Sequence, residues 1–430
     1  MESNAKSGFK WKIFRTVGPL LMALLLLGLL FLSTLRITPG YTKQQLRAFA
    51  MDSTSRASFV GYSVKQQAMA DKSFLPIMGS SELQHLDPYF PSVYAEKYQT
   101  SWTPFLVGQP GTQSLTHYFW LNSVAPEMQH RKIVFIISPQ WFVNRGILAP
   151  MFENFTSKGE IDMWLESANP KDVATQTLAA RLLGFKTFDN DNAIKSALLS
   201  LQKGKAIDAL TLATIQFSAR VWKHEDLLFS RFNSQLTDKK NPLTQLSALT
   251  KKLPEKSDFT ALDSQAYDEA AAASTSNPYR VSDTIWNKSL KNRYKQMSGY
   301  QNKYSYLQSP EYADFQLLLN AFAKNHDDVQ FIIQPVNNAW YSYTGLSMQM
   351  MADFSTKITE QLTSQGFKNI ADYTYNYDEP YFVGDTDHLG YRGWVAVDET
   401  ITNFMKAKSQ TNYTLNNAKY LSKDWQQMKP

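Results

Sequence analysis

Residues 132–137 read KIVFII, and the polar, turn-forming Ser138-Pro139-Gln140 follow at once. A short, continuous apolar run of this kind is typical of a strand covered on both faces, because such a strand loses the alternation of apolar and polar residues. Three other runs have the same form: SFLPIM at 73–78, TPFLV at 103–107 and VQFII at 329–333. The spacings between the runs leave room for crossover helices. The sequence therefore predicts an α/β fold with a parallel sheet flanked by helices.

Each predicted strand runs into a polar or glycine-containing loop. In a parallel sheet these loops meet at the carboxyl edge, where open α/β sheets place their ligand sites. We therefore expect the chemistry to lie in four loops: 79–81, 108–113, 138–141 and 334–338. Pro76 is unusual in the first run, because proline donates no ladder hydrogen bond and is rare within interior strands.

The long segment between the third and fourth runs, about residues 144–328, has a helical pattern. Apolar residues recur there at helix-like spacing, for example at Ile194, Leu198 and Leu201. We expect this segment to be a helical insertion into the α/β domain, in a position to cap the site.

The N-terminal residues predict a membrane anchor. Residues 17–35 carry no charge and have about the length that roughly 20 helical residues need to cross a bilayer. Four basic residues precede them: Lys6, Lys10, Lys12 and Arg15. Positive charge stays on the cytoplasmic side, so we expect a single-pass plasma-membrane protein with a cytoplasmic segment 1–16, a transmembrane anchor 17–35 and an extracellular domain 36–430. A cleaved signal peptide is disfavoured, because the apolar run is longer than the usual core of about 7–15 residues.

Composition excludes several classes of site. The 430 residues contain no cysteine, so disulfides, thiolate metal sites and cysteine nucleophiles are absent, and no motif for a cofactor or metal ion is present. The formal net charge is +6, but the first 16 residues hold four basic residues and one acidic residue, which leaves about +3 for the remainder. We expect an ordinary solvated surface and no nucleic-acid partner.

Ser81 lies at a predicted strand-to-helix junction, in Gly79-Ser80-Ser81-Glu82. A serine there is commonly a helix N-cap. It can also be a nucleophile whose own backbone N–H helps to bind an oxyanion. A nucleophilic serine needs a base, usually a histidine oriented by a carboxylate.

His388 is the best placed of the six histidines to be that base. It follows Asp385 by three residues, and a carboxylate at this spacing can bend back to accept the imidazole Nδ1–H, which leaves Nε2 for a hydroxyl. We expect the adjacent Asp387 to face away. The alternative is a polar Gly-Asp turn whose histidine is merely exposed.

The order of these motifs resembles that of the SGNH (GDSL-like) hydrolases and acyltransferases, whose sheet is flavodoxin-like. This resemblance implies that Ser81 is the nucleophile, that Asp385 and His388 support it, and that Gly111 and Gln140 are further oxyanion donors. The chain departs from the pattern at Ser80, where aspartate is usual, and at Gln140, where asparagine is usual.

Longer strings resemble the DltD family of D-alanyl-lipoteichoic acid biosynthesis proteins of Gram-positive bacteria. They span nearly the whole chain: GSSEL at 79–83, GQPGTQS at 108–114, ISPQWF at 137–142, SPEY at 309–312 and DHLGYRGW at 387–394. The resemblance implies a role in attaching D-alanine esters to lipoteichoic acid outside the cell, with a membrane-bound O-acyltransferase and a D-alanyl carrier protein as partners.

We expect a serine acyltransferase that takes a D-alanyl group onto Ser81 and passes it to a hydroxyl of lipoteichoic acid. Two alternatives stay open: an esterase or thioesterase of the same fold that hydrolyses D-alanyl groups, and a non-catalytic scaffold of the same machinery. Trp141 and Trp340 follow predicted strands at the same edge and are candidates to hold the acceptor and limit water, or else to seal the domain against the insertion.

Overall fold

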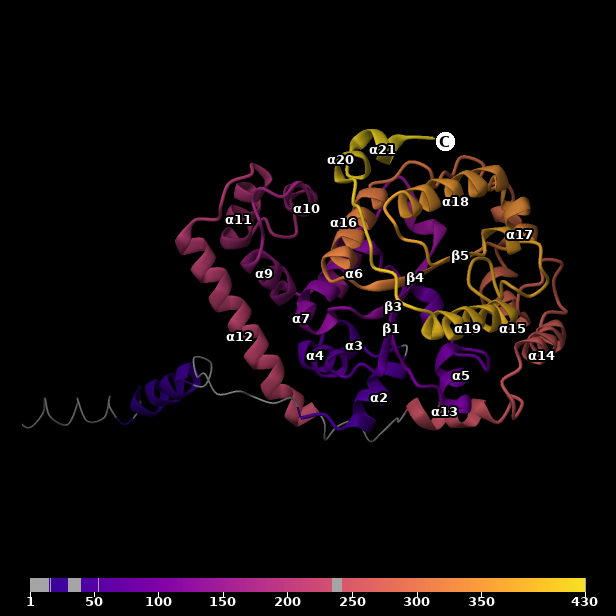
Figure 1. The fold of residues 1–430 in the computed structure, drawn as a ribbon, viewed down its shortest axis with the longest axis horizontal. Coiled ribbons are helices and arrows are strands. Elements are labelled where there is room, and N and C mark those ends of the chain that lie inside the picture. The colour runs from indigo at the N-terminus through magenta and orange to yellow at the C-terminus, as the bar shows by residue number, and fades with distance from the viewer. Residues whose placement is uncertain (1–14, 16, 30–39, 53, 234–241, 430) are drawn as a thin grey trace, which may run out of the picture.

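The structure is a computed structural model that describes residues 15, 17–29, 40–52, 54–233 and 242–429. Its centre is a parallel five-stranded sheet of order β2-β1-β3-β4-β5 (Figure 1). The strands are β1 (Phe74–Met78), β2 (Thr103–Val107), β3 (Lys132–Ile137), β4 (Asp328–Ile333) and β5 (Ile370–Asp372). The predicted α/β class with a parallel sheet flanked by helices is confirmed, and the strand order is that of flavodoxin-like sheets.

Pro76 lies within β1 and pairs with Phe105 of β2. The ladder between β1 and β3 begins only at Ile77, one residue later. The strand therefore tolerates a proline because its neighbour on the β3 side joins after that position.

The sheet is buried on both faces, which explains the continuous apolar runs. Along β1, Phe74 and Met78 belong to one core cluster, whereas Leu75 and Ile77 belong to another. Successive side chains of a strand point to opposite faces, so each face has its own hydrophobic core.

One face of the sheet is covered by helices from the first and last parts of the chain. These are α2 (Lys43–Met51), α3 (Ala57–Val60), α4 (Tyr62–Ala70), α6 (Ser114–Ser123), α7 (Ala125–Met128), α16 (Glu311–Lys324) and α18 (Met348–Thr363). The other face is covered by α5 (Pro91–Tyr98), α13 (Pro242–Thr250), α14 (Phe259–Ala272) and α19 (Tyr391–Lys406).

The segment 144–328 contributes to both sides of the sheet. Its first helices are α8 (Ala149–Phe155), α9 (Lys158–Glu166), α10 (Val173–Leu183), α11 (Asn192–Gln202) and α12 (Ala209–Asn233). They share a third core cluster with Leu115 and Phe119 of α6, so they pack outside the first helical layer (Figure 1). Helices α13 and α14 instead pack on the opposite face, through Leu246 and Leu262.

Short elements complete the chain. They are α15 (Asp283–Ile285), α17 (Asn338–Thr344), α20 (Asn417–Tyr420), α21 (Lys423–Gln427), the 3₁₀ turns η1 (Ser81–Gln84), η2 (Pro139–Phe142), η5 (Tyr294–Met297) and η6 (Thr374–Asn376), and the π-turn η4 (Trp286–Leu290).

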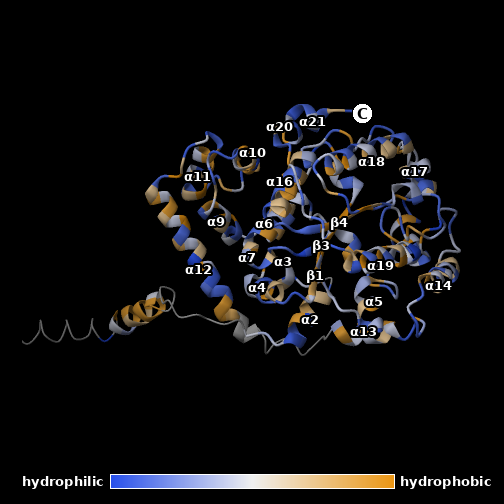
Figure 2. Ribbon diagram, in the orientation of Figure 1, coloured by the Kyte–Doolittle hydropathy of each residue, from blue (hydrophilic) through white to orange (hydrophobic). Residues whose placement is uncertain are grey.

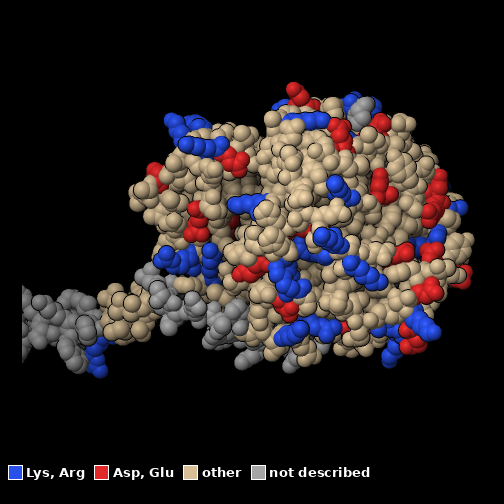
Figure 3. Space-filling model, in the orientation of Figure 1, with Lys and Arg blue, Asp and Glu red and all other residues tan. Residues whose placement is uncertain are grey.

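Residues 17–29 of the predicted anchor are helical, and residues 30–35 lie outside the described residues. The helical part consists mainly of hydrophobic residues (Figure 2). Leucines such as Leu20, Leu21 and Leu24 are more than half exposed. Within the residues that the structure describes, none of the helices is both long and apolar enough to span a membrane. The surface shown in Figure 3 carries basic and acidic side chains interspersed.

Candidate active site

Ser81 opens the 3₁₀ turn that follows β1. The preceding Ser80 has an uncommon backbone conformation, φ −136° and ψ −127°, and makes no side-chain cap of the turn. The buried carboxylate of Glu82 accepts hydrogen bonds from the Ser80 backbone N–H (2.6 Å) and hydroxyl (2.8 Å). Trp141 donates its indole N–H to the Ser80 hydroxyl oxygen at 3.1 Å. These contacts hold the turn in place and do not involve the Ser81 side chain.

The structure brings Ser81, His388 and Asp385 together. Ser81 Oγ lies 2.8 Å from His388 Nε2, and His388 Nδ1 lies 2.7 Å from Asp385 Oδ2. In the neutral imidazole with the proton on Nδ1, that N–H donates to Asp385, and Nε2 accepts the Ser81 hydroxyl proton. The Ser81 oxygen is therefore engaged with a base and not with a helix terminus.

The Asp385 side chain is held by its own loop. Its Oδ1 accepts hydrogen bonds from the backbone N–H groups of Asp387 (2.9 Å) and His388 (2.8 Å). Burial alone would raise the pKa of Asp385, but the His388 charge and these hydrogen bonds lower it to about 2. The carboxylate is therefore ionised at neutral pH and available to stabilise an imidazolium.

Asp387 does not face away, contrary to the expectation from the sequence. Its Oδ1 lies 3.5 Å from His388 Nδ1, because the loop curls so that both carboxylates flank the ring. Burial would lower the pKa of His388, but Asp385 and then Asp387 raise it above the ordinary value. The ring of His85 also lies close, with centroids 4.8 Å apart.

Asn337, in the loop after β4, anchors the histidine loop. Its backbone N–H donates to the Thr386 carbonyl (3.0 Å), and its side-chain amide donates to the Asp385 carbonyl (2.9 Å). The same amide lies 2.8 Å from the Tyr279 carbonyl, which belongs to the long segment between β3 and β4. The base is thus fixed to the sheet edge by a residue that sequence reasoning placed only in a polar loop.

The loop after β2 packs directly on the serine turn. A Cβ at Gly108 would lie 2.9 Å from the Ser80 carbonyl oxygen and 2.6 Å from Leu83 Cδ1, so only glycine allows this approach. The Gly79 carbonyl accepts hydrogen bonds from the Thr112 hydroxyl and from His117 Nε2, each at 2.8 Å. Burial lowers the pKa of His117 to about 4, which keeps this histidine neutral as a structural donor.

The candidate oxyanion donors lie at the same edge. The backbone N–H groups of Ser81, Gly111 and Gln140 donate to no acceptor among the described residues, so they are free to meet a ligand. Gly111 has φ +92°, a conformation that favours glycine. The Gln140 side chain is not a free donor. Its amide donates to Asp387, and its carbonyl oxygen accepts from the Ser138 hydroxyl (2.6 Å).

A cavity of about 580 Å³ adjoins the triad. Gly111, Gln140 and Asp387 line it, together with Trp340. Trp340 is only 2% exposed and contacts Tyr279 and Tyr343. Trp141 does not line this cavity, since it lies in the core beside Phe135 and His117. The two tryptophans proposed together from the sequence therefore occupy different environments.

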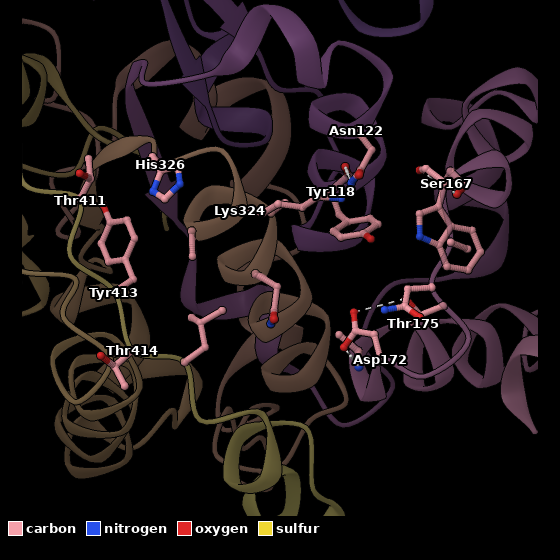
Figure 4. Close-up of a pocket in the computed structure, with 18 of the residues that line it drawn as sticks. Tyr118, Asn122, Ser167, Asp172, Thr175, Lys324, His326, Thr411, Tyr413 and Thr414 are labelled. Atoms are coloured by element: carbon pink, nitrogen blue, oxygen red, sulfur yellow. Dashed lines mark hydrogen bonds between the residues drawn. The ribbon is translucent and has the colours of Figure 1, made fainter. Parts of the chain in front are cut away.

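A larger cavity of about 760 Å³ lies away from the triad (Figure 4). It is bounded by Tyr118 of α6, Asp172 and Thr175 at the start of α10, and the C-terminal residues Thr411–Leu415. His326, at the amino end of β4, also lines it, so this cavity belongs to the sheet edge opposite Ser81. Because it lies at the edge opposite Ser81, its larger volume does not identify it as the reaction site.

One group of side chains has the donor types of a metal site. His85, Asp385 and His388 offer ligand atoms that lie within 4.8 Å of one another. Two of these groups already bond each other, and His388 also contacts Ser81. This favours a serine–histidine–aspartate arrangement over ligation.

Sequence reasoning missed three residues that shape the site: Glu82, Asn337 and His117. Glu82 is the residue after Ser81, and an acidic residue at the start of a turn is common on protein surfaces. Only its complete burial distinguishes it. Asn337 and His117 likewise carry no signal in the sequence, because the groups that they contact are backbone carbonyls of distant segments.

The chain is similar to known proteins over nearly its whole length. The family model described as DltD protein matches residues 51–406. A Protein DltD of Lacticaseibacillus rhamnosus is 36% identical over 418 residues, which are 96% of each chain. A Protein DltD of Bacillus subtilis (strain 168) is 30% identical over 402 residues, 93% of this chain and 99% of the relative. This match is continuous and includes the serine turn, the histidine loop and the parallel sheet. The chain belongs to the DltD family.

Proposed function

We propose that the protein is a serine acyltransferase of teichoic acid D-alanylation, which accepts a D-alanyl group on Ser81 and transfers it to a hydroxyl of lipoteichoic acid. The observation that carries the proposal is the chain of contacts from Ser81 Oγ through His388 to Asp385, at 2.8 and 2.7 Å. Membership of the DltD family supports the pathway.

In the first half-reaction, His388 Nε2 takes the Ser81 hydroxyl proton while Oγ bonds to the carbonyl carbon of an activated D-alanyl ester or thioester. The carbonyl oxygen becomes an oxyanion that the free N–H groups of Ser81, Gly111 and Gln140 are available to bind. The bond to the leaving group then breaks, and that group takes the proton from His388. The product is D-alanyl-Ser81.

In the second half-reaction, His388 removes a proton from the acceptor hydroxyl, whose oxygen attacks the acyl carbon. The ester bond to Ser81 breaks, and His388 returns its proton to Oγ. Asp385 stabilises the imidazolium in both halves. Water attacks by the same chemistry, so the outcome depends on what occupies the adjoining cavity.

The setting of the proposal is the outer face of the plasma membrane. It rests on the uncharged segment 17–35 behind a basic N-terminal segment. The partners that the family resemblance implies are a membrane-bound O-acyltransferase and a D-alanyl carrier protein, with lipoteichoic acid as acceptor.

Mass spectrometry of the full chain in detergent, after incubation with an activated D-alanyl thioester, tests the proposal. We expect one added D-alanyl group on the peptide that contains Ser81, and none in Ser81→Ala. Release of the group as free D-alanine only, even with lipoteichoic acid present, would instead indicate an esterase or thioesterase. No acylation of Ser81 under any of these conditions would leave a scaffold.

A further inference from the structure

Helix α12 has apolar residues on two opposite sides. Its inner side packs on α4 and α9, with Ile215 and Ala219 buried. The ring centroids of Trp222 and Tyr62 are 5.5 Å apart, and a Cβ at Gly159 would lie 2.0 Å from Trp222 Cδ2. These contacts already hold α12 on the domain. A helix that covers a core with one side is ordinarily polar on the other, so apolar residues on the outer side have a separate cause.

The outer side of α12 carries a second apolar stripe. Its members follow one another at intervals of four and three residues, which places them on one face of the helix: Leu210, Thr214, Phe217, Val221, His224 and Leu228. Leu210 is 80% exposed and Phe217 is 54% exposed. The Thr214 hydroxyl donates to the Leu210 carbonyl (2.9 Å), so this polar group is satisfied within the helix. Figure 1 shows α12 at the outer edge of the molecule, on the left of the view.

The C-terminal half of α12 lies beside the point at which the chain enters the domain. Asp226 accepts a hydrogen bond from the Ser63 backbone N–H of α4 (2.6 Å), and Gln67 of the same helix donates to the Tyr41 carbonyl (2.6 Å). Burial raises the pKa of Tyr41, and the charge of Asp226 raises it as well. Residues 36–41 connect the predicted anchor to this point, and six residues span no more than about 22 Å. The bilayer that holds the anchor is therefore within reach of α12.

We propose that the outer stripe of α12 lies in the surface of this bilayer, with Leu210 and Phe217 between the lipid headgroups and the acyl chains. Helix α12 is not apolar enough to cross a membrane, whereas an apolar face along a helix suits a position in the plane of the interface. Exposed cations flank the stripe: Lys203 and Lys205 precede α12, and Arg220 is within one turn of Phe217. Anionic headgroups attract such cations, which favours a lipid surface over an apolar protein surface as the partner.

This inference rests on the membrane anchor of the proposed function and adds to it the orientation of the domain. A single transmembrane segment fixes where the domain is attached but not which way it faces. A second contact along α12, which is about 37 Å long, fixes that direction. Helices α9 to α12 are joined to the rest of the domain through the third core cluster, so the position of α12 sets how far Ser81 stands from the lipid.

The chain contains no cysteine, so single cysteines can be introduced and labelled without background. The experiment attaches the fluorophore NBD to Leu210→Cys and to Phe217→Cys in the full chain, in vesicles of phosphatidylcholine and phosphatidylglycerol in equal parts. Doxyl groups on the acyl chains quench a fluorophore that lies in the bilayer, in either orientation of the protein. We expect both labels to be quenched at least about twofold more than a label at Tyr267→Cys.

Tyr267 is the matched control because it is comparably exposed (42%) but lies on α14, which covers the opposite face of the sheet. A label at Leu20→Cys reports insertion of the anchor separately. Phe217→Ser in the Leu210→Cys protein should lower the quenching toward the control value, because it removes the largest apolar group of the stripe. Tyr267→Ser in the same protein should leave the quenching unchanged.

Labels on α12 that are quenched no more than the label at Tyr267, with strong quenching at Leu20, would overturn the inference and leave the stripe to a protein partner. Quenching that Phe217→Ser does not lower would overturn it as well. Absence of quenching at every position, Leu20 included, would remove both the contact and the anchor.

Acylation of Ser81, measured in the same vesicles, separates this inference from the proposed function. Quenching on α12 without acylation would support the membrane contact and remove the acyltransferase. Acylation without quenching on α12 would do the reverse.

Discussion

Asp387 Oδ1 lies 3.5 Å from His388 Nδ1, so the imidazole that contacts Ser81 is faced by a second carboxylate besides Asp385. Both carboxylates, with a smaller contribution from the buried Glu82, favour the imidazolium and raise the pKa of His388 against the effect of burial. His388 must be neutral to accept the Ser81 proton. The rate of Ser81 acylation should therefore rise with pH through a value above the ordinary histidine pKa of about 6.5.

Asp387→Asn should move this rise to lower pH, because removing a negative charge makes the imidazolium less stable and lowers the pKa of His388. The measurement is the acylation rate against pH by rapid quench and mass spectrometry. Asp378→Asn is the control, since Asp378 is an exposed carboxylate that binds Asn338. A profile of Asp387→Asn that coincides with the wild-type profile would show that Asp387 does not act on the base.

Ser81→Ala and His388→Ala should each lower D-alanyl esterification of the cell surface to background, by roughly 10³-fold or more in rate, while the protein stays folded. The double variant should be no worse, because the two groups act as a unit. Ester-linked D-alanine released by mild base is the measurement, and the exposed Ser298→Ala is the control. Normal esterification with Ser81→Ala would leave the scaffold as the function.

Trp340→Ala should raise the ratio of free to esterified D-alanine in a reconstituted membrane system. Trp340 lines the cavity beside Asp387, and its removal admits water to the acyl group. Trp141→Ala was expected from the sequence to do the same, but Trp141 is buried and bonds Ser80.

For that reason Trp141→Phe, which removes the indole N–H and keeps an aromatic ring, is the sharper comparison. It should slow acylation and cost more unfolding free energy than the about 0.5–1.5 kcal/mol of a lost hydrogen bond, because the smaller ring also leaves a cavity, with the ratio of free to esterified D-alanine unchanged. An unchanged ratio in Trp340→Ala would exclude a role of this side chain in keeping water out.

Lys65→Met should destabilise the protein by about 3–5 kcal/mol, because it leaves the carboxylate of Glu160 buried without a counter-charge. The pair lies at 2.5 Å, joins α4 to α9 and is essentially inaccessible to water. Lys419→Met, which breaks an exposed pair with Glu360, should cost less than about 1 kcal/mol. Denaturant titration of both variants measures their unfolding free energies. Equal losses in the two variants would contradict the larger contribution of the buried pair.

Protease added outside intact cells should digest the region after Ile37 and spare the first residues. The reason is the basic cluster that precedes the uncharged segment 17–35. Immunoblotting with an N-terminal tag measures this. A free mature form that begins near Arg36 would show that the segment is a cleaved signal peptide.

The strands that the sequence predicts are those with a strong local signal. Continuous apolar runs such as 132–137 and 329–333 correspond to β3 and β4, because strands buried on both faces need apolar side chains throughout. The fifth strand, Ile370–Asp372, was missed. It has three residues, all only partly buried, at the sheet edge, so it carries no periodic pattern to detect.

The candidate site shows the same difference: a contact within a short segment can be predicted from the sequence, whereas a contact that depends on distant segments cannot. The Asp385–His388 contact follows from a three-residue spacing, which a sequence displays directly. The position of Asp387 depends on how the loop curls, and the burial of Glu82 depends on elements far along the chain. Trp141 illustrates the limit, because a strand-end position predicts the edge on which a residue lies but not whether its side chain turns inward.

Ser81 and His388 are separated by 307 residues, and the loop of the histidine is held by Asn337 and, through it, by Tyr279. The serine is therefore synthesised long before its base, and long-range contacts of this kind form only after much of the chain has been ordered. A nascent or partly folded chain therefore has Ser81 without its contact to His388. Under the proposed function, such a chain could not accept an acyl group on Ser81 until the loop of His388 is in place.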